Sequence, residues 1–233
     1  MLRSLSSGYS ALVIGASGAI GQAICAEFEA DPGCASLLRL SRSTFPGFDL
    51  RHSSSLAAAA SALSVKARLA VVIDATGALS TGTAGPEKSL AALDPAAMQE
   101  LMQINAVGPL LLLRELAPRL ARDRCLYGKL SARVGSIEDN RLGGWYSYRA
   151  SKASLNMLLQ TAAVELHRRL PGLVIAAMQP GTVVSSLSRR LVSATTPVVE
   201  ARQAAAGLLK TLDTLEAGPR AHFVDYRGQM IPW

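Results

Sequence analysis

Short apolar runs recur along the whole chain, with room for a helix between most of them. Each run is four to six residues long, which is typical of strands buried in a parallel sheet. We predict strands over residues 11–14, 36–40, 69–73, 125–130, 173–178 and 221–224. Residues 48–50 are predicted to form a further short strand, although residues 41–47 leave no room for a helix before it.

Longer segments with helical periodicity separate these strands. They predict helices over residues 21–30, 53–63, 95–122, 147–170 and 197–215. The alternation favours a doubly wound α/β fold, in which right-handed crossovers place helices on both faces of one parallel sheet. Residues 1–233 are therefore predicted to form a single domain. A ligand is expected beyond the carboxyl ends of the strands, where the loops 77–93, 132–146 and 181–196 begin.

Composition and charge narrow the class of protein. Hydrophobic residues make up 49% of the 233 residues and aromatic residues only 5%, which suits helices packed closely on a buried sheet. The formal charge of +7 comes mainly from scattered arginines, so we expect no nucleic-acid partner, although a basic surface suits an anionic small ligand. The apolar runs are too short for a membrane span, so we expect no membrane association.

Cysteine and histidine usage bears on location and metal binding. The three cysteines are odd in number and lack the CxxC spacing of metal sites, which predicts a reducing, cytoplasmic location. The three histidines are far apart in the sequence, so we expect no metal site. These residues are Cys25, Cys34, Cys125, His52, His167 and His222.

The first predicted strand runs into a glycine-rich turn and then a helix. Its spacing is GxxGxxG, which permits a tight turn and a close backbone approach to a pyrophosphate at a helix N-terminus. The alternative is an ordinary strand-turn-helix unit with structural glycines. The predicted dinucleotide-binding residues of this turn are Gly15, Ser17, Gly18, Ala19, Ile20 and Gly21.

Arg42 follows the second predicted strand, directly after Ser41. An acidic residue there would bind the ribose of NAD, whereas a small hydroxyl residue followed by arginine accommodates the 2′-phosphate of NADP. We therefore predict NADP(H) over NAD(H), with a solvated loop arginine as the alternative. Asp49 would accept from the adenine amino group or cap the helix that follows. The turn after the strand 69–73 would approach the adenosine or be only a turn: Ala75, Thr76 and Gly77.

Tyr148 and Lys152 lie one helical turn apart, on the same face of the predicted helix 147–170. A phenol with a pKa near 10 is a poor acid-base catalyst at neutral pH. An adjacent ammonium group stabilises the phenolate and lowers its pKa, so the pair suits proton transfer. Taken alone, the spacing is also that of an ordinary surface pair.

The motifs, taken together in chain order, resemble the short-chain dehydrogenase/reductase superfamily. Besides the glycine-rich turn and Tyr148-Arg-Ala-Ser-Lys152, they include Asn105 in Ile-Asn-Ala-Val-Gly-Pro, Ser-Ala-Arg-Val-Gly-Ser and Pro180-Gly-Thr. Residues 143–156 and the ending 228–233 are similar to the C-factor and sniffer-like carbonyl reductase branch. The resemblance implies a Rossmann-type fold and an NADP(H)-dependent oxidoreductase that acts on a small carbonyl or alcohol substrate.

The resemblance also implies roles for individual residues. Tyr148 would protonate the carbonyl oxygen, while Lys152 would bond the nicotinamide ribose and lower the pKa of Tyr148. Asn105 would hold a water in a proton relay, unless it only satisfies a local backbone group. The chain would turn against the nicotinamide and bond its carboxamide through the segment Pro180, Gly181, Thr182, Val183 and Ser185. A flap over about 182–196, containing Leu187, Leu191 and Val192, would favour a hydrophobic substrate.

The catalytic serine is left open, because Ala132 stands where much of the superfamily carries it. Ser131 should point away from the substrate unless the strand is bulged, since side chains alternate along a strand. Ser136 lies in a loop that would turn back over the nicotinamide, and we prefer it as the donor to a developing alkoxide. Its hydroxyl would serve equally well to satisfy a loop backbone group.

Other functions and an assembly also remain open. A non-catalytic nucleotide-binding signalling protein of the C-factor type would keep this fold, although Tyr148, Lys152 and Asn105 argue for an enzyme. A sugar-nucleotide epimerase or dehydratase shares the tyrosine-lysine spacing but normally has a longer C-terminal region. The helices 95–122 and 147–170 are apolar around much of their circumference, which predicts a homodimer or homotetramer joined through them.

Overall fold

The computed structural model describes residues 2–64, 68–81, 85–185 and 197–233. In these ranges the strands form one parallel sheet with the order β2-β1-β3-β4-β5-β6. The strand order reverses at β1, between β2 and β3, which is where a crevice opens at the carboxyl ends of the strands. The strands are β1 (Tyr9–Ile14), β2 (Cys34–Leu40), β3 (Leu69–Asp74), β4 (Cys125–Leu130), β5 (Leu173–Gln179) and β6 (His222–Asp225).

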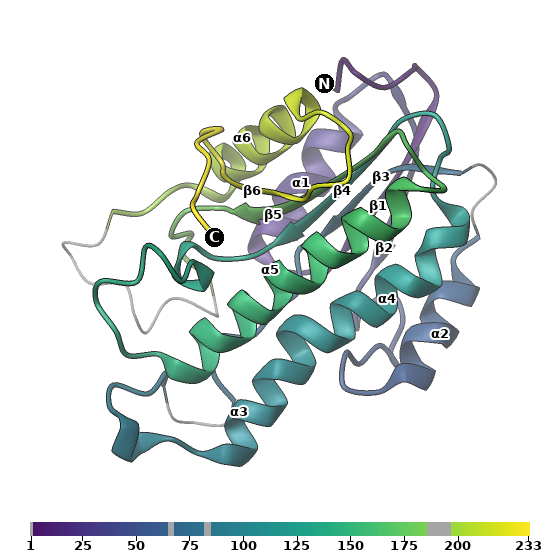
Figure 1. The fold of residues 1–233 in the computed structure, drawn as a ribbon. Coiled ribbons are helices and arrows are strands. Elements are labelled where there is room, and N and C mark those ends of the chain that lie inside the picture. Colours follow the sequence, from purple (N-terminus) through teal and green to yellow (C-terminus); the bar gives the residue numbers. More distant parts are fainter. Residues whose placement is uncertain (1, 65–67, 82–84, 186–196) are drawn as a thin grey trace.

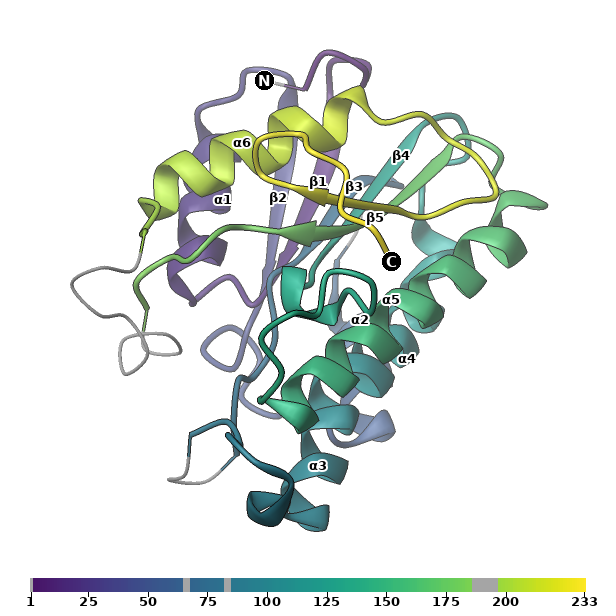
Figure 2. The same cartoon turned by 60° about the vertical axis from the view of Figure 1, so that its left-hand side comes forward.

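Helices cover both faces of the sheet. Figures 1 and 2 show α2, α4 and α5 on one face and α1 with α6 on the other. Each side has its own apolar core, because the strands bury side chains in both directions. The predicted doubly wound fold is confirmed. The helices are α1 (Ala19–Glu29), α2 (Ser53–Ala62), α3 (Pro95–Met102), α4 (Gly108–Leu116), α5 (Tyr146–His167) and α6 (Ala201–Thr214).

Two predicted elements differ in the structure. The predicted strand at residues 48–50 is wrong: Phe48 and Leu50 are buried, yet the segment pairs with no strand. Its apolar side chains fill the core beneath α2 from a loop, which produces the same sequence signal as a strand. The predicted helix 95–122 is interrupted, because a π turn at Gln103–Val107 separates α3 from α4 and a 3-10 turn ends the segment at Ala117–Arg119.

The described helices also bear on membrane association. None of them is both long and apolar enough to cross a membrane. The three cysteines carry free thiols, with Cys25 and Cys125 buried in the two cores.

Candidate active site

The glycine-rich turn depends on close backbone packing. Gly15 has a φ of +76°, a left-handed conformation that favours glycine, and a Cβ there would lie 3.0 Å from the carbonyl carbon of Ala75. A Cβ on Gly21 would lie 2.1 Å from the Gly15 oxygen, so α1 can approach β1 only with glycine at this position. The N-cap residue of α1 is Gly18, so no side chain caps the helix, and its first turn has no acidic residue. The helix N-terminus is therefore suited to an anion.

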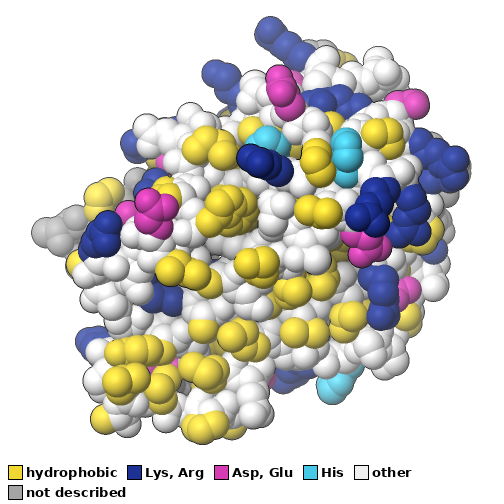
Figure 3. Space-filling view, in the orientation of Figure 1, with side chains coloured by type: hydrophobic (Ala, Val, Ile, Leu, Met, Phe, Trp, Pro, Cys, Tyr) yellow, Lys and Arg dark blue, Asp and Glu magenta, His cyan; other side chains and the backbone are white. Residues whose placement is uncertain are grey.

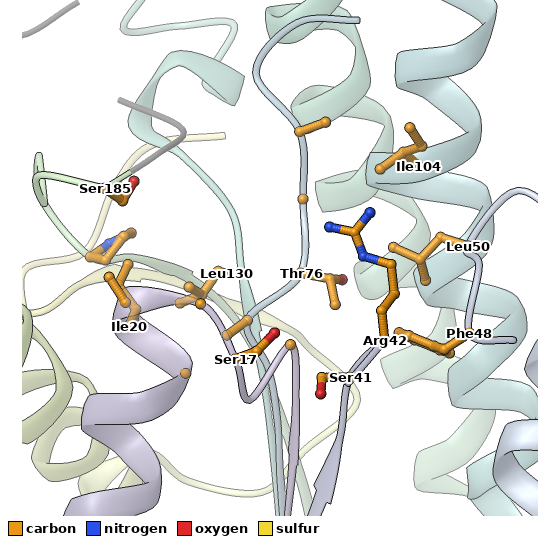
Figure 4. Close-up of a pocket in the computed structure, with 18 of the residues that line it drawn as sticks. Ser17, Ile20, Ser41, Arg42, Phe48, Leu50, Thr76, Ile104, Leu130 and Ser185 are labelled. Carbon is orange, nitrogen blue, oxygen red and sulfur yellow. The ribbon is translucent and has the colours of Figure 1, made fainter. Parts of the chain in front are cut away.

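A pocket of about 600 Å³ lies beyond the carboxyl ends of β1, β2, β3 and β4. Figure 4 shows Arg42, Phe48 and Leu50 on one side of it, and Ile20 with Ser185 on the other. The pocket gathers most of the residues predicted for cofactor binding: Gly15, Ser17, Gly18, Ala19, Ile20, Gly21, Arg42, Asp49, Ala75, Thr76, Gly77, Tyr148, Lys152, Pro180 and Ser185. Other lining residues had not been predicted as site residues: Ser41, Phe48, Leu50, Arg51, Ala78, Ile104 and Leu130.

Arg42 extends from the end of β2 along the pocket wall formed by Phe48 and Leu50. Asp49 binds the neighbouring guanidinium of Arg51 through both carboxylate oxygens, with distances of 2.6 to 3.1 Å. These hydrogen bonds hold the pKa of Asp49 down at about 2. The alternative that Asp49 caps α2 is wrong, since His52 is the N-cap residue and no side chain caps the helix.

The start of α5 brings Tyr148 and Lys152 to the pocket. Gly143, Gly144 and Trp145 all adopt left-handed backbone conformations, with φ values of +63°, +64° and +54°. This turn directs the chain into α5. Glu87, from a distant loop, binds the start of that helix, because its carboxylate accepts from the Ser147 N–H and hydroxyl.

Tyr148 and Lys152 are both buried, with 9% and 3% of their surface exposed. The Lys152 ammonium lies 5.7 Å from the centroid of the Tyr148 ring and donates to the Leu130 carbonyl oxygen at 3.0 Å. Burial lowers the pKa of Lys152 to about 7, with the nearby Lys129 charge acting in the same direction and Asp74 opposing it. Burial raises the pKa of Tyr148, contrary to the expectation from sequence, because desolvation of the phenol is the effect that dominates here.

Asn105 lies in the π turn and binds the segment that follows β3. Its side-chain oxygen accepts from the Ala78 N–H at 2.8 Å, and its amide donates to the Ala78 oxygen at 2.7 Å and to Ser151 at 3.0 Å. The side chain is fully buried and is not part of the pocket lining. Asn105 therefore ties the floor of the pocket to α5.

The two candidate serines occupy different places. Ser131 lines the pocket, and its hydroxyl donates to Asn156 Oδ1 at 2.7 Å. Ser136 is not among the lining residues, and its hydroxyl accepts from the Asp139 N–H at 3.0 Å within its own loop. Ala132 lies beside Tyr148 in a small apolar cluster with Leu79.

The segment after β5 reaches the pocket at two residues. Pro180 and Ser185 line it, whereas Gly181, Thr182 and Val183 do not. The Thr182 oxygen accepts from the Val199 N–H at 2.9 Å, so this stretch packs against the approach to α6. The predicted flap continues to residue 196, but residues 186–196, with Leu187, Leu191 and Val192, lie outside the described residues.

Sequence reasoning missed a buried ion pair next to the pocket. Asp74 ends β3, Lys129 lies opposite it on β4, and both side chains have no exposed surface. Their charged groups are 3.0 Å apart. A charge inside an otherwise apolar strand is unusual and would have been the signal, because Asp and Lys are almost never fully buried unless paired.

Comparisons with known proteins agree with this geometry. A family model described as short chain dehydrogenase matches residues 9–196. The chain is 31% identical over 191 residues to 1-hydroxy-2-glutathionyl-2-methyl-3-butene dehydrogenase of Rhodococcus sp. (strain AD45), covering 81% of this chain and 79% of that protein. It is 32% identical over 153 residues to C-signal of Myxococcus xanthus, covering 65% and 88% respectively.

Solved structures show the same fold. One of them is the NADPH-bound carbonyl reductase from chicken fatty liver, with a TM-score of 0.83 and 22% identity over 98% of this chain and 96% of that chain. The family model and the relative from Rhodococcus confirm the resemblance to the short-chain dehydrogenase/reductase superfamily.

Proposed function

The chain belongs to the short-chain dehydrogenase family, and from that premise we propose that it is an NADP(H)-dependent reductase of small, hydrophobic carbonyl compounds. Oxidation of the corresponding alcohol is the reverse reaction. The observation that carries the proposal is one pocket that holds the glycine-rich turn, Arg42 and the Tyr148–Lys152 pair together.

The pocket fits a phosphorylated dinucleotide. The uncapped N-terminus of α1 offers backbone N–H groups to a pyrophosphate, and Gly15 and Gly21 keep that turn free of side chains. Arg42 follows a serine and would pair with a 2′-phosphate, and no acidic residue stands there to bind a free ribose hydroxyl. Lys152 would bond the nicotinamide ribose, while Pro180 and Ser185 would contact the nicotinamide end.

The chain's own residues supply the proton. Bound NADPH would provide the hydride that reaches the carbonyl carbon. Tyr148 would donate the proton of its hydroxyl to the carbonyl oxygen, and the Lys152 ammonium would stabilise the phenolate that this leaves. Asn105 would hold the floor of the site in place through Ala78. The apolar cluster of Leu79, Ala132 and Tyr148, with Val134 and Trp145 packed against it, favours a hydrophobic substrate.

An assay of NADPH consumption, on wild type and on a Tyr148 variant, tests this proposal. We expect the purified protein to consume NADPH with at least one member of a panel of aldehydes, ketones and quinones. Tyr148→Phe should reduce kcat by about 10² to 10⁴, because the proton donor is lost, and should keep its affinity for NADPH. Tyr146→Phe is the matched control and should retain turnover. Full activity of Tyr148→Phe would contradict the assignment.

The similarity to C-signal favours a second candidate, a nucleotide-binding signalling protein without turnover. The absence of serine at Ala132 is compatible with it. NADPH binding together with no consumption of NADPH across the whole panel would support this candidate over the reductase.

We also propose a homodimer, formed through α4 and α5. A groove of about 840 Å³ runs between these helices, and its apolar lining includes Leu110, Leu111 and Leu158. Figure 3 shows hydrophobic side chains spread over this face of the molecule. A second copy would bury this face by packing the same two helices against it, because a two-fold interface uses one surface twice.

A further inference from the structure

A layer of buried polar side chains lies between the sheet and α5, below the pocket. It contains two lysines and a single carboxylate: Lys152 on α5, Lys129 on β4 and Asp74 on β3, each with at most 3% of its surface exposed. The reaction proposed above uses Lys152 and leaves the other two without a role. Burying an extra ion pair is expensive, and an apolar pair would often be as stable.

We propose, on the basis of the proposed reductase function, that Lys129 is a positioning residue of the active site. Its ammonium anchors the turn under the pocket and pairs with Asp74, the carboxylate of this layer, whose charge also acts on Lys152. Through its own charge and its pairing with Asp74, Lys129 thereby determines how strongly the surroundings favour the ammonium form of Lys152. Lys129 and Asp74 act on the site through the turn and through Lys152.

The anchoring follows from the hydrogen bonds of Lys129. Its ammonium donates to Asp74 Oδ1 at 3.0 Å, to the Thr76 carbonyl oxygen at 2.6 Å and to the Thr76 hydroxyl at 3.0 Å. Asp74 Oδ1 in turn accepts from the Thr76 N–H at 2.9 Å. Thr76 and Gly77 line the pocket, and a Cβ on Gly77 would lie 3.4 Å from the Lys152 ammonium. The Lys129 ammonium therefore holds the turn against which the Lys152 ammonium lies.

The carboxylate is not fully satisfied by this network. In the part of the chain that the structure describes, Asp74 Oδ2 is buried and has no hydrogen-bond partner. Removal of the Lys129 charge would leave Lys152 as the buried cation nearest to Asp74, while Thr76 would still donate to Asp74 Oδ1, and the ammonium form of Lys152 would become more stable. The direction agrees with the pKa of Lys152, which Lys129 lowers and Asp74 raises.

Other charged groups on the elements around Lys152 lie at the surface or are half-buried with partners of their own. Arg149 on α5 donates to the Val134 and Gly144 backbone oxygens, and Glu87 accepts from the Ser147 hydroxyl. On its own helix, Tyr148 is the titratable neighbour, at 5.7 Å from the ring centroid to the ammonium. The 3-10 turn that packs on α5 carries Arg133, which pairs with Asp139 at 2.9 Å. The remaining charged residues of the helices beside α5 form exposed pairs of their own: Glu100 with Arg51, and Arg114 with Glu115.

The test compares Lys129→Met with the double variant Lys129→Met/Asp74→Asn. Both lose the anchor on Thr76, so both should bind NADPH about fivefold more weakly, the equivalent of one lost hydrogen bond. Only the single variant keeps the carboxylate. In wild type, kcat/KM for carbonyl reduction should fall as pH rises through the Lys152 pKa, because the ammonium form is the active one. In Lys129→Met this fall should move up by about one pH unit.

The double variant separates the effect of the Lys129 charge on Lys152 from the effect of losing the hydrogen bonds to Thr76. We expect its pH profile to return toward that of wild type, since both the second cation and the carboxylate are gone. A merely structural Lys129 would give the two variants the same profile, and that result would overturn the inference. If Lys129→Met does not fold, Lys129→Gln replaces it, because glutamine keeps one N–H donor for Asp74 and removes the charge.

Failure of the proposed function would be recognised separately. If wild type binds NADPH but reduces no carbonyl compound, the pH dependence of the NADPH dissociation constant replaces kcat/KM, because Lys152 is proposed to bond the ribose. The same upward shift in Lys129→Met, absent from the double variant, would support the inference. An unshifted profile would overturn it.

Discussion

In the proposed reductase, Arg42 is the residue on which the choice between the two nicotinamide cofactors would depend. Arg42→Ala should raise the Kd for NADPH by about 10- to 100-fold, because a hydrogen bond between charged groups contributes about 1.5 to 3 kcal/mol. The Kd for NADH should stay the same. Arg39→Ala is the control, since Arg39 lies near the end of β2, three residues before Arg42, but pairs with Glu29 and does not line the pocket. Fluorescence titration measures all four values, and an unchanged NADPH affinity in Arg42→Ala would rule out its role.

A substitution at Ala132 is expected to increase activity. It lies beside Tyr148, and a serine hydroxyl there would donate to the alkoxide that develops on the substrate. Ala132→Ser should therefore raise kcat for carbonyl reduction by about tenfold or more, given that one such donor typically contributes about 10² to 10³. Ala132→Cys is a control of similar size with a weaker donor. Steady-state kinetics decide the matter, and a kcat at or below that of wild type would contradict this expectation.

The residues of the site could be predicted from sequence where they belong to a spaced motif. The glycines, Tyr148 and Lys152 are recognisable because the backbone geometry that they need fixes their separation. Lys129 could not be placed in this way, because its partner Asp74 is distant in sequence and the two meet only across a sheet. The raised pKa of Tyr148 also could not be predicted, since it depends on the burial of the phenol.

At the scale of the element, the contact between α1 and β1 depends on one glycine. Gly21→Ala places a Cβ 2.1 Å from the Gly15 oxygen, and both groups belong to the backbone. We expect it to destabilise the protein by about 1 to 3 kcal/mol, as overpacking of a close contact does. Gly18→Ala is the matched control, because its Cβ would lie at an ordinary 3.4 Å and its φ is −76°. Thermal unfolding of the two variants should give a lower Tm for Gly21→Ala only.

Most helices and strands could be predicted because their apolar periodicity reflects which face is buried. The failures have specific physical causes. Phe48 and Leu50 are buried from a loop, and burial alone does not distinguish a loop from a short strand. The π turn inside 95–122 keeps helical periodicity on both sides, so the interruption leaves little trace in the pattern of apolar residues.

At the scale of the whole molecule, the exposed apolar face of α4 and α5 calls for a test of assembly. Met157 on α5 has 66% of its surface exposed, and a lysine there would place a charge in the proposed interface. Met157→Lys should therefore shift the protein from dimer to monomer in light scattering at micromolar concentration. Met230→Lys is the control, because Met230 is exposed to a similar 62% but lies beyond β6. A monomeric wild type would contradict the proposed dimer.

The layers of the fold could be predicted as a whole, because alternation of strand and helix leaves few other arrangements. The order of the strands in the sheet could not be predicted in this way. It depends on which apolar faces meet in space, as with β3, which pairs with β1 on the opposite side from β2. That reversal creates the crevice, so the sequence predicted where the pocket begins but not which side chains close it.

The π turn at Gln103–Val107 bears on how the chain tolerates a change in length. A π turn holds one residue more than the α turn it replaces, so it is equivalent to a single insertion that the helix has absorbed locally. Deleting one residue within this turn would restore a continuous α-helix and leave both flanking segments in step. The regular helix would gain backbone hydrogen bonds, but Asn105 would rotate away from Ala78. Selection for stability alone would favour the shorter chain, whereas in the proposed reductase selection for turnover would retain the extra residue.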